Sequence, residues 1–226
     1  MKKSVAIIGL GRFGLSLVES FSKLNVEIIA IDKNVEYVKK ASEMTTNAFI
    51  VDSTDEEALK SVGVSNVDQV IVAFGQNEKN NLAASVITII KLKELGIKNI
   101  IARADEDDYV EILKLIGATE IVTPLYIASE RIANRVASEN VVDYFNIKND
   151  FNVFEVKVQE DFTDLALIDL DLRTKYSVNI LLIERDNETI IPTKSTIIKA
   201  NDDIFIFGRK RDIPKITTFF NKKVKK

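Results

Sequence analysis

Residues 5–14, VAIIGLGRFG, decide the fold of the first half of the chain. An apolar run ends in glycines spaced as G-x-G-x-x-G, and an amphipathic segment follows it. In a strand–turn–helix unit Gly9 makes the tight turn, Gly11 lets backbone approach a phosphate, and Gly14 lets the helix pack against the strand. A helix that starts at Arg12 offers amide groups and the positive end of its dipole to an anion. This stretch therefore predicts a phosphate-binding loop.

A second apolar run, residues 27–31, ends in Asp32. An acid roughly 20 residues beyond the glycine motif accepts hydrogen bonds from ribose hydroxyl groups in dinucleotide-binding units. Its carboxylate would repel a 2′-phosphate, which disfavours NADP even though Lys33 is the next residue. The alternative for Asp32 is an ordinary strand-end or capping residue.

The composition is that of a soluble globular chain of one or two domains, with 226 residues of which 46% are hydrophobic and 29% charged. No apolar stretch approaches the roughly 20 residues of a membrane span, and the apolar run after Met1 is too short for a secretory signal. We therefore expect a cytoplasmic protein. The net charge of -3 provides no pull towards nucleic acid. The basic tail, residues 222–226, is interpreted as a solvated chain end rather than a contact with membrane or nucleic acid.

Cysteine and histidine are both missing from the sequence. Their absence rules out disulfides and thiolate metal sites, and it removes the commonest general base and the commonest metal ligand. A dehydrogenase on a nicotinamide-binding fold usually needs a proton-transfer residue, for which lysine, tyrosine or aspartate would have to serve. The composition therefore favours a protein that binds a nucleotide without turning it over, and predicts neither catalytic residues nor a metal site.

Apolar and amphipathic segments alternate regularly through the first half of the chain. This alternation predicts an α/β fold, a doubly wound parallel Rossmann sheet with helices on both faces. The expected strands are residues 5–8, 27–31, 48–51, 69–73, 99–102 and 120–123, and the expected helices are 36–42, 55–62, 78–95, 107–116 and 126–137. Thr54 or Ser53 is expected to cap the helix over residues 55–62.

In such a sheet the ligand lies outside the carboxyl ends of the strands, at the topological switch point. The residues expected there are Gly9, Gly11, Arg12, Phe13, Gly14, Asp32, Lys33, Asp52, Ser53, Thr54, Ala73, Phe74, Gly75 and Arg103. Arg12 and Arg103 could face phosphate, and the two acids could face ribose or a phosphate-bound metal. The alternative is that these are strand-end polar residues without a ligand.

The helix over residues 78–95 carries a narrow polar stripe. Between Leu82 and Leu92 its polar residues are Ser85, Thr88 and Lys91, spaced by three, so most of its circumference is apolar. A helix on a sheet needs only one apolar side. Another subunit is the simplest candidate for the remaining surface, with the chain's own second domain as the alternative.

The pattern changes after residue 138, which we take as the end of the first domain, with residues 139–150 as a linker. Residues 151–226 are expected to form a small α+β domain, too small to hold a conventional substrate domain. Its strands fall at 153–158, 179–183, 189–191 and 203–207, and its short helices at 165–173 and 212–221, with Pro214 in the first turn of the latter. Asp186-Asn187 predicts a hairpin turn, and residues 200–203 predict a turn into the last strand.

From end to end the chain resembles the regulator of potassium conductance (RCK, or KTN) family, and within it the soluble gating subunits of Ktr-type, TrkA-like potassium uptake systems. The resemblance is carried by IIGLGRFG at 7–14 with Asp32, DSTD at 52–55, VIVA at 70–73, LKELG at 92–96, IGA at 116–118, NVVDY at 140–144, LDLRTKY at 170–176, Asn179-Ile180 and residues 203–208. It implies a regulatory site rather than a catalytic one. Members form dimers and octameric rings, bind ATP or ADP and often NAD(H), and act on a membrane potassium channel subunit of the KtrB or KtrD kind.

The resemblance also implies roles for particular residues. Phosphate would be bound by the backbone of residues 9–14 together with Arg12 and Arg103, and ribose by Asp32. Similar proteins bind cyclic di-AMP between two C-terminal domains, which points to Leu172, Arg173, Asn179, Ile180 and Pro192. Arg173 has an alternative as a surface partner of Asp169 or Asp171.

One departure from the family pattern concerns a metal. Relatives commonly carry a glutamate near the phosphates after Thr123-Pro124, whereas this chain has Leu125, so a bridging divalent cation is not expected. The protein would be attached peripherally to the inner face of the membrane through the channel subunit. Two rival functions stay open, a small NAD-dependent dehydrogenase and a bare oligomerisation module.

Overall fold

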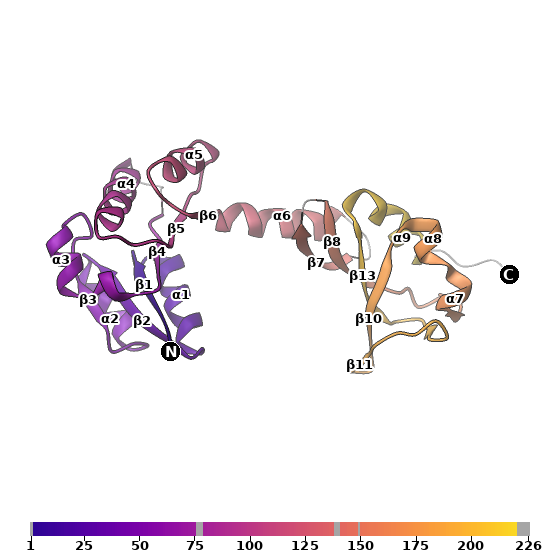
Figure 1. Ribbon diagram of the computed structural model, residues 1–226. Helices are drawn as coiled ribbons and strands as arrows, with labels where there is room; N and C mark the ends of the chain where they lie inside the picture. Colours follow the sequence, from indigo (N-terminus) through magenta and orange to yellow (C-terminus); the bar gives the residue numbers. More distant parts are fainter. Residues whose placement is uncertain (1, 76–78, 138–140, 149, 221–226) are drawn as a thin grey trace. The chain divides into compact units, whose positions relative to one another are not determined.

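The computed structural model describes residues 2–75, 79–137, 141–148 and 150–220 (Figure 1). The chain divides into two compact units, Met1–Tyr126 and Ile127–Lys226. Glu78, the expected first residue of a helix, and the basic tail at 222–226 lie outside the described residues. The described part contains no helix that is both long enough and apolar enough to cross a membrane.

The first unit is built on a parallel sheet, in which the order of the strands is β3-β2-β1-β4-β5-β6. Its strands are β1 (Lys3–Ile8), β2 (Val26–Asp32), β3 (Ala48–Ile50), β4 (Gln69–Val72), β5 (Ile100–Arg103) and β6 (Glu120–Val122). The chain forms β1, β2 and β3 in one direction across the sheet and then crosses back to place β4 on the other side of β1, so the topological switch point lies between β1 and β4. The doubly wound Rossmann arrangement expected from the sequence is confirmed.

Helices cover both faces of this sheet (Figure 1). On one face lie α1 (Arg12–Ser22) and α2 (Val35–Ser42), and on the other α3 (Glu56–Ser61), α4 (Lys79–Glu94) and α5 (Asp107–Leu115). The short helix η1 (Val64–Asn66) precedes β4, and α6 (Pro124–Ala137) begins at the end of the first unit and belongs mostly to the second. In β1 the side chains of Val5 and Ile7 pack towards the first pair, and those of Ala6 and Ile8 towards the others. Because both faces are covered, β1 reads as a continuous apolar run.

The helix caps differ from those expected in one place. The carboxylate of Asp55, rather than Ser53 or Thr54, caps α3 by accepting hydrogen bonds from the amides of Glu57 and Ala58. Thr54 is engaged elsewhere, because its hydroxyl and its amide both donate to Asp52. Asp55 directly precedes the helix and therefore has the position from which a cap reaches the first amides.

The narrow polar stripe of α4 faces inwards. Ser85 and Thr88 are buried, whereas Ile87 and Ile90 are 43% and 40% exposed. The buried hydroxyls are satisfied locally, since Ser85 donates to the carbonyl of Asn81 and Thr88 shares a hydrogen bond with Ser53. Apolar side chains therefore occupy both sides of α4, since Ile89 and Leu92 are buried in the core while Ile87 and Ile90 are exposed.

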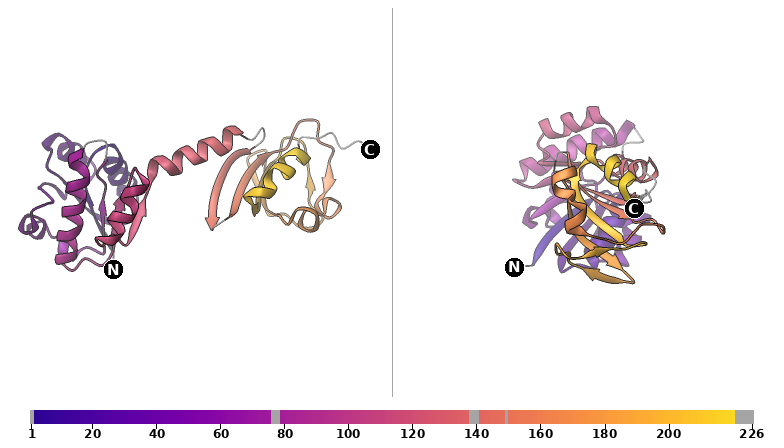
Figure 2. Two further views of the ribbon diagram at one scale, coloured as in Figure 1. Left: turned by 90° about the horizontal axis from the view of Figure 1, so that it is seen from above. Right: turned by 90° about the vertical axis from the view of Figure 1, so that its right-hand side faces the viewer.

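The second unit holds an antiparallel sheet in the order β11-β10-β13-β8-β7 (Figure 2). Its strands are β7 (Val141–Lys148), β8 (Phe151–Lys157), β10 (Asn179–Arg185), β11 (Glu188–Ile190) and β13 (Asp203–Arg209), and a second small sheet pairs β9 (Leu165–Ala166) with β12 (Ile197–Ile198). The helices are α7 (Leu167–Leu170), α8 (Leu172–Tyr176), η2 (Lys210–Asp212) and α9 (Ile213–Phe220). The small α+β domain is confirmed.

Two boundaries in this unit need correction. The stretch 139–150, expected to be a linker, contains β7, an edge strand held to β8 by ladder pairing and to α6 by the ion pair of Asp143 with Arg131. The single helix expected over 165–173 is wrong: Leu165–Ala166 form β9, which pairs with β12, and Asp171 separates α7 from α8 by adopting a left-handed conformation with φ of 47°. The hairpin turn at Asp186-Asn187 is confirmed, with positive φ at both residues as a tight hairpin requires.

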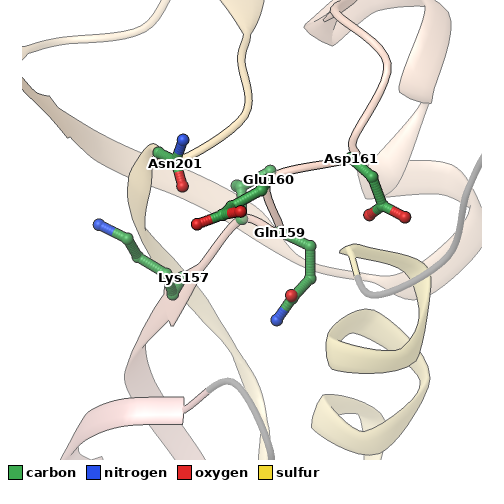
Figure 3. Close-up of a pocket in the computed structure, with 6 residues that line it drawn as sticks. Lys157, Gln159, Glu160, Asp161 and Asn201 are labelled. Carbon is green, nitrogen blue, oxygen red and sulfur yellow. The ribbon is translucent and has the colours of Figure 1, made fainter.

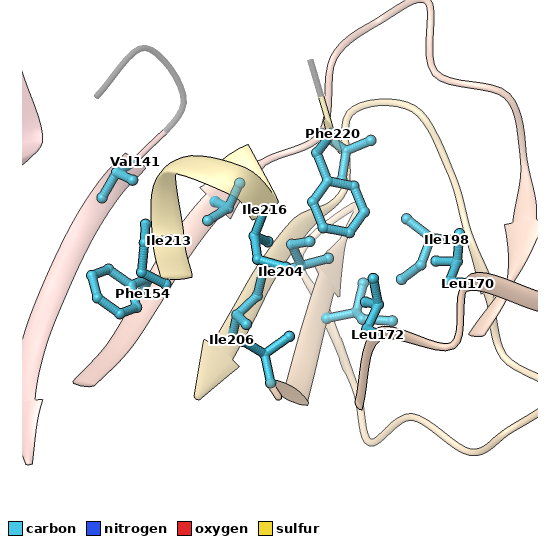
Figure 4. Packing of buried hydrophobic residues seen from close by; sticks show 14 of the residues in the cluster. Val141, Phe154, Leu170, Leu172, Ile198, Ile204, Ile206, Ile213, Ile216 and Phe220 are labelled. Carbon is cyan, nitrogen blue, oxygen red and sulfur yellow. The ribbon is translucent and has the colours of Figure 1, made fainter. Parts of the chain in front are cut away.

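The core of the second unit lies between one face of this sheet and α9 (Figure 4). Alternate residues of β8 and β13 are buried, including Phe154, Ile204 and Ile206, and Ile216 and Phe220 of α9 pack against them. The period of two in burial is what the alternating side chains of a strand produce. This core is continuous from Val141 in β7 to Leu172 in α8.

Candidate functional site

The glycine turn after β1 is shaped for close approach of backbone to a ligand. Gly9 has a φ of 93°, and a Cβ atom there would lie 2.6 Å from Cδ1 of Phe74. A Cβ on Gly14 would collide with the carbonyl of Gly9, whereas a Cβ on Gly11 would have no atom within 4 Å. Gly9 and Gly14 are therefore required by packing, and Gly11 keeps the approach to the start of α1 open.

Asp32 at the end of β2 holds this turn in place. One carboxylate oxygen accepts a hydrogen bond of 2.6 Å from the amide of Leu10, and the other accepts one of 2.8 Å from the amide of Asn34. A carboxylate offers about four lone-pair positions, so both oxygens retain capacity for hydroxyl donors. Asp32 therefore does cap local backbone at the end of β2, which was the alternative left open by the sequence. Its carboxylate also lies beside the glycine turn, where it could accept hydrogen bonds from a ribose.

Asp105 and Phe13 both contact Arg103 at the end of β5. Its guanidinium makes a two-pronged ion pair with Asp105, with distances of 2.8 Å and 2.9 Å, and it lies over the ring of Phe13 with 5.4 Å to the centroid. A Cβ on Gly75 would lie 3.6 Å from Nη1 of Arg103. The structure therefore brings together Phe13, Gly75 and Arg103, which are separated in sequence but share the carboxyl edge of the sheet.

Asp105 is a site residue that sequence reasoning missed. Its side chain is 7% exposed and that of Arg103 is 13% exposed. The sequence did contain a signal for this contact, because Asp105 follows Arg103 by two residues at a strand end, a spacing that allows an ion pair. Asn81 was missed as well, and its side-chain amide donates to the carbonyl of Gly75 at 2.5 Å.

The loop after β3 contributes unevenly to the site. Asp52 is exposed and accepts hydrogen bonds from the amide and hydroxyl of Thr54; these bonds, together with the positive charge of Lys33, hold the pKa of Asp52 below its ordinary value. Ser53 is buried, and its hydroxyl lies 2.8 Å from that of Thr88 in α4. The hydroxyl of Ser53 is therefore directed to α4. The charged side chains that the loop after β3 brings to the candidate site are Asp52 and its neighbour Lys33.

The remaining expected residues differ in exposure. Arg12 is exposed in the first turn of α1, and Ala73 is buried with its amide donating to the carbonyl of Ile8. Leu125 is exposed at the start of α6. Among the described residues no three acidic side chains converge in the way a metal site requires.

Four of the five residues expected at the C-terminal ligand site lie on α8 and β10. In the described part of the chain Arg173 donates from Nε to the side-chain oxygen of Asn179 at 2.7 Å, and not to Asp169 or Asp171. Leu172 is buried, and Ile180 is half-buried against the core. Pro192 is half-buried beyond β11. A cation, an amide and apolar side chains thus stand together on α8 and β10.

A separate hollow of about 490 Å³ opens at the end of β8 (Figure 3). It is lined by Lys157, Val158, Gln159, Glu160, Asp161 and Asn201. None of the expected ligand residues lines it, and Lys157 is already paired with Asp203. It does not coincide with either candidate site.

The sheet order, the open glycine turn and the small antiparallel unit define a two-domain protein of the Rossmann class. The family model of the TrkA-N domain matches residues 5–124, and that of the TrkA-C domain matches residues 153–221. The chain belongs to the TrkA-N/TrkA-C, or RCK, family, and specifically to its Ktr potassium uptake proteins, which are regulatory and not enzymatic.

Individual relatives agree with this assignment over nearly their whole length. The chain is 38% identical over 214 residues to the Ktr system potassium uptake protein C of Bacillus subtilis (strain 168), covering 94% of this chain and 95% of that protein. It is 34% identical over 212 residues to the Ktr system potassium uptake protein A of the same strain, covering 93% and 94%. Among solved structures, the GsuK channel bound to NAD is similar with a TM-score of 0.64 and 16% identity, over 98% of this chain and 40% of that one, which supports the fold.

Proposed function

We propose that this chain is the nucleotide-binding, cytosolic gating subunit of a Ktr-type potassium uptake channel. ATP or ADP, and also NAD(H), would bind at residues 9–14. The observation that carries this proposal is the open space at Gly11. It lies in a turn that is hydrogen-bonded to the carboxylate of Asp32, and the guanidinium of Arg103, which Asp105 holds in place, is at the same edge of the sheet. Because amide groups at a helix start attract anions, a phosphate at Gly11 would meet the first turn of α1.

The charged residues around the turn match two different parts of a nucleotide, its phosphates and its ribose. Arg103 lies beside Gly75 and over Phe13, and Arg12 opens α1, so cations are present on the phosphate side. Asp32 adjoins the turn through the amide of Leu10 and would accept from ribose hydroxyls. This division matches a nucleotide, whose anionic and hydroxyl-bearing parts are adjacent.

Turnover of the nucleotide is not proposed, because the residue types that most often transfer protons in such sites are missing. The sequence contains neither histidine nor cysteine. The pKa of Asp52 lies below its ordinary value, which makes this carboxylate a weak base at neutral pH. Gating then requires that two nucleotides favour different shapes of the assembly, since a ligand with equal affinity for both shapes shifts nothing.

Assembly into dimers and an octameric ring is proposed from the apolar surfaces of the helices. Ile87 and Ile90 on α4 are exposed, as are Leu115 at the end of α5 and Val136 on α6. Apolar patches of this kind mark contacts with other chains. A ring would carry the change of shape to the membrane channel subunit, which would hold the protein at the inner face of the membrane.

The second domain is proposed to bind cyclic di-AMP between two copies. Arg173 and Asn179 are joined by a hydrogen bond and would offer a guanidinium for phosphate and an amide for a base or phosphate. Leu172 and Ile180 supply apolar surface for adenine. Because the ligand is two-fold symmetric, an isologous pair of domains would bind it with the same residues from each copy.

The decisive experiment is potassium flux through the reconstituted channel with this chain and either ATP or ADP. The proposal expects different fluxes with the two nucleotides, and a Gly11→Ala chain serves as the control that should lose the difference. Equal flux with ATP, ADP and no nucleotide would contradict gating. Steady release of phosphate or reduced cofactor during the same incubation would instead favour an enzyme.

A further inference from the structure

The inward face of α4 connects this helix to the edge of the sheet at which the nucleotide site is proposed. Asn81, Ser85 and Thr88 are spaced by four and three residues, so they lie on one face of the helix. The side-chain amide of Asn81 donates to the carbonyl of Gly75 at 2.5 Å. The hydroxyl of Thr88 lies 2.8 Å from that of Ser53. Two residues expected at the nucleotide site are therefore hydrogen-bonded to α4.

The hydrogen bond between Ser53 and Thr88 joins two buried side chains. A buried hydroxyl that loses its partner also lacks the hydrogen bond that water would supply, so separating the two is costly. Ser53 lies in the loop after β3, in which Asp52 accepts hydrogen bonds from the amide and the hydroxyl of Thr54. A shift of this braced loop therefore favours a matching shift of α4.

An ion pair attaches α4 to the same segment a little further along. Nζ of Lys91, three residues beyond Thr88, lies 3.6 Å from a carboxylate oxygen of Glu56. Glu56 is the first residue of α3 and follows Ser53 by three residues. Because both charged side chains are partly exposed, this ion pair contributes little by itself. It places the second contact of the segment 53–56 on the same helix.

The exposed side of α4 is the surface at which another subunit is proposed to pack, and Ile87 and Ile90 lie there. Ile87 directly precedes Thr88, and the backbone of a helix is held by its own hydrogen bonds, so a shift of Thr88 also shifts Ile87. A neighbouring subunit packed on α4 would therefore respond to the position of the loop after β3, and would fix that position in turn.

We propose that α4 couples the nucleotide site to the subunit interface, and that Thr88 is the positioning residue through which the coupling passes. The proposal rests on the proposed nucleotide site and adds the regulation of that site. Association of subunits at α4 strengthens nucleotide binding, and nucleotide binding strengthens association by the same factor. Thr88 is buried and acts through Ser53 rather than as a ligand.

The test is a thermodynamic cycle on the full chain with ADP as the probe, in which calorimetry gives the dissociation constant and light scattering gives the particle mass. Ile87→Asp places a charge on the exposed side of α4, so it should lower the mass and weaken ADP binding about tenfold, a typical coupling between two sites. Thr88→Val removes the hydroxyl and keeps the shape of the side chain. In that background Ile87→Asp should weaken ADP binding by no more than about twofold, as expected for independent sites.

Two control backgrounds separate this hydroxyl from buried hydroxyls in general. Ser85→Ala removes a buried hydroxyl from the same face of α4, but one that donates within the helix to the carbonyl of Asn81, so the full effect of Ile87→Asp should persist. Thr88→Ser retains a hydroxyl and should also keep the effect. The double variant S53A/T88V leaves neither hydroxyl unpaired, which costs less stability than losing one partner, and should lose the coupling as Thr88→Val does.

The outcomes distinguish the inference from the site on which it rests. Equal weakening of ADP binding by Ile87→Asp in the wild-type and Thr88→Val backgrounds would overturn the role of Thr88. An Ile87→Asp chain that has a lower mass but binds ADP as the wild type does would overturn the coupling and leave the nucleotide site standing. An Ile87→Asp chain with the mass of the wild type would show that α4 is not the interface, and the inference would fail. A wild-type chain that does not bind ADP would contradict the nucleotide site itself.

Discussion

Gly14 lies directly against the carbonyl group of Gly9, so no side chain fits between α1 and the glycine turn. We expect Gly14→Ala to displace the turn and to lower the free energy of unfolding by about 1–3 kcal/mol, the usual cost of overpacking. Gly11 is the matched control, because it faces open space and has a φ of -64° that alanine accepts. Gly11→Ala should change stability by less than about 0.5 kcal/mol while weakening nucleotide binding. Denaturant unfolding and calorimetry measure the two effects, and unchanged binding by Gly11→Ala would contradict the phosphate loop.

The charge of Asp32 should exclude a 2′-phosphate from the ribose position. Asp32→Asn retains one oxygen acceptor but loses the negative charge, so we expect the affinity for NADP relative to NAD to rise about tenfold. Asp68→Asn is a suitable control, because Asp68 is also an acid near a strand of this sheet but binds Ser4 instead of the turn. Titration with both dinucleotides measures the ratio. If Asp32→Asn left the ratio of NADP to NAD affinity unchanged, the role of Asp32 would be purely structural.

The outward apolar surface of α4 should be an interface between subunits. Replacing the exposed Ile87 or Ile90 by aspartate places a charge in that interface, so we expect the particle mass in solution to fall from that of the ring to that of a smaller assembly. Lys98→Asp, a charge change at an exposed residue just beyond the same helix, should leave the mass unchanged. Light scattering gives the mass. A wild-type chain that is monomeric at micromolar concentration would refute the interface.

Arg173 should be required for cyclic di-AMP and dispensable for nucleotide binding by the first domain. Arg173→Ala removes the guanidinium that Asn179 holds, so we expect the heat of binding of one ligand per dimer to disappear in calorimetry. Lys175→Ala removes a cation from the same helix and should keep the binding. No heat from the wild-type chain with cyclic di-AMP would leave the second domain with a role in dimerisation alone.

Glu155 should make the second unit less stable as pH rises. Burial raises the pKa of Glu155, and the negative charges of Asp203, Asp143 and Glu184 add to this effect, while Lys157 opposes it. A carboxyl group whose pKa is raised in the folded state binds protons more tightly there than in the unfolded chain, so ionisation costs stability. Glu155→Gln should therefore raise the free energy of unfolding at pH 7 by up to about 1 kcal/mol.

This advantage of Glu155→Gln should vanish below the ordinary glutamate pKa, about 4.3, where the carboxyl is protonated in both states. Urea unfolding at several pH values measures the difference between the two proteins. Glu160→Gln, at an exposed position beyond β8, should show no such trend. An advantage that stayed constant with pH would show that charge is not its cause.

Much of the fold follows from local patterns. The apolar run ending at Ile8, the hairpin at Asp186-Asn187 and the placement of Pro214 depend on the chemistry of neighbouring residues, and each was predicted at the observed place. The cap at Asp55 was missed because several capping residues compete at the same turn. The strand β7 was missed because an edge strand with Asp143 and Asn146 lacks the continuous apolar run of a buried one.

The sequence by itself determined that this chain forms a Rossmann sheet with a tight glycine turn after its first strand, because the spacing of Gly9, Gly11 and Gly14 reflects backbone constraints that act within a few residues. Only the tertiary structure decided what the polar residues do. It turned Ser53 towards Thr88, joined Arg173 to Asn179, and paired Arg103 with Asp105 over Phe13. The physical reason is that hydrogen bonds and ion pairs depend on distances between side chains, and those distances exist only once strands and helices have packed.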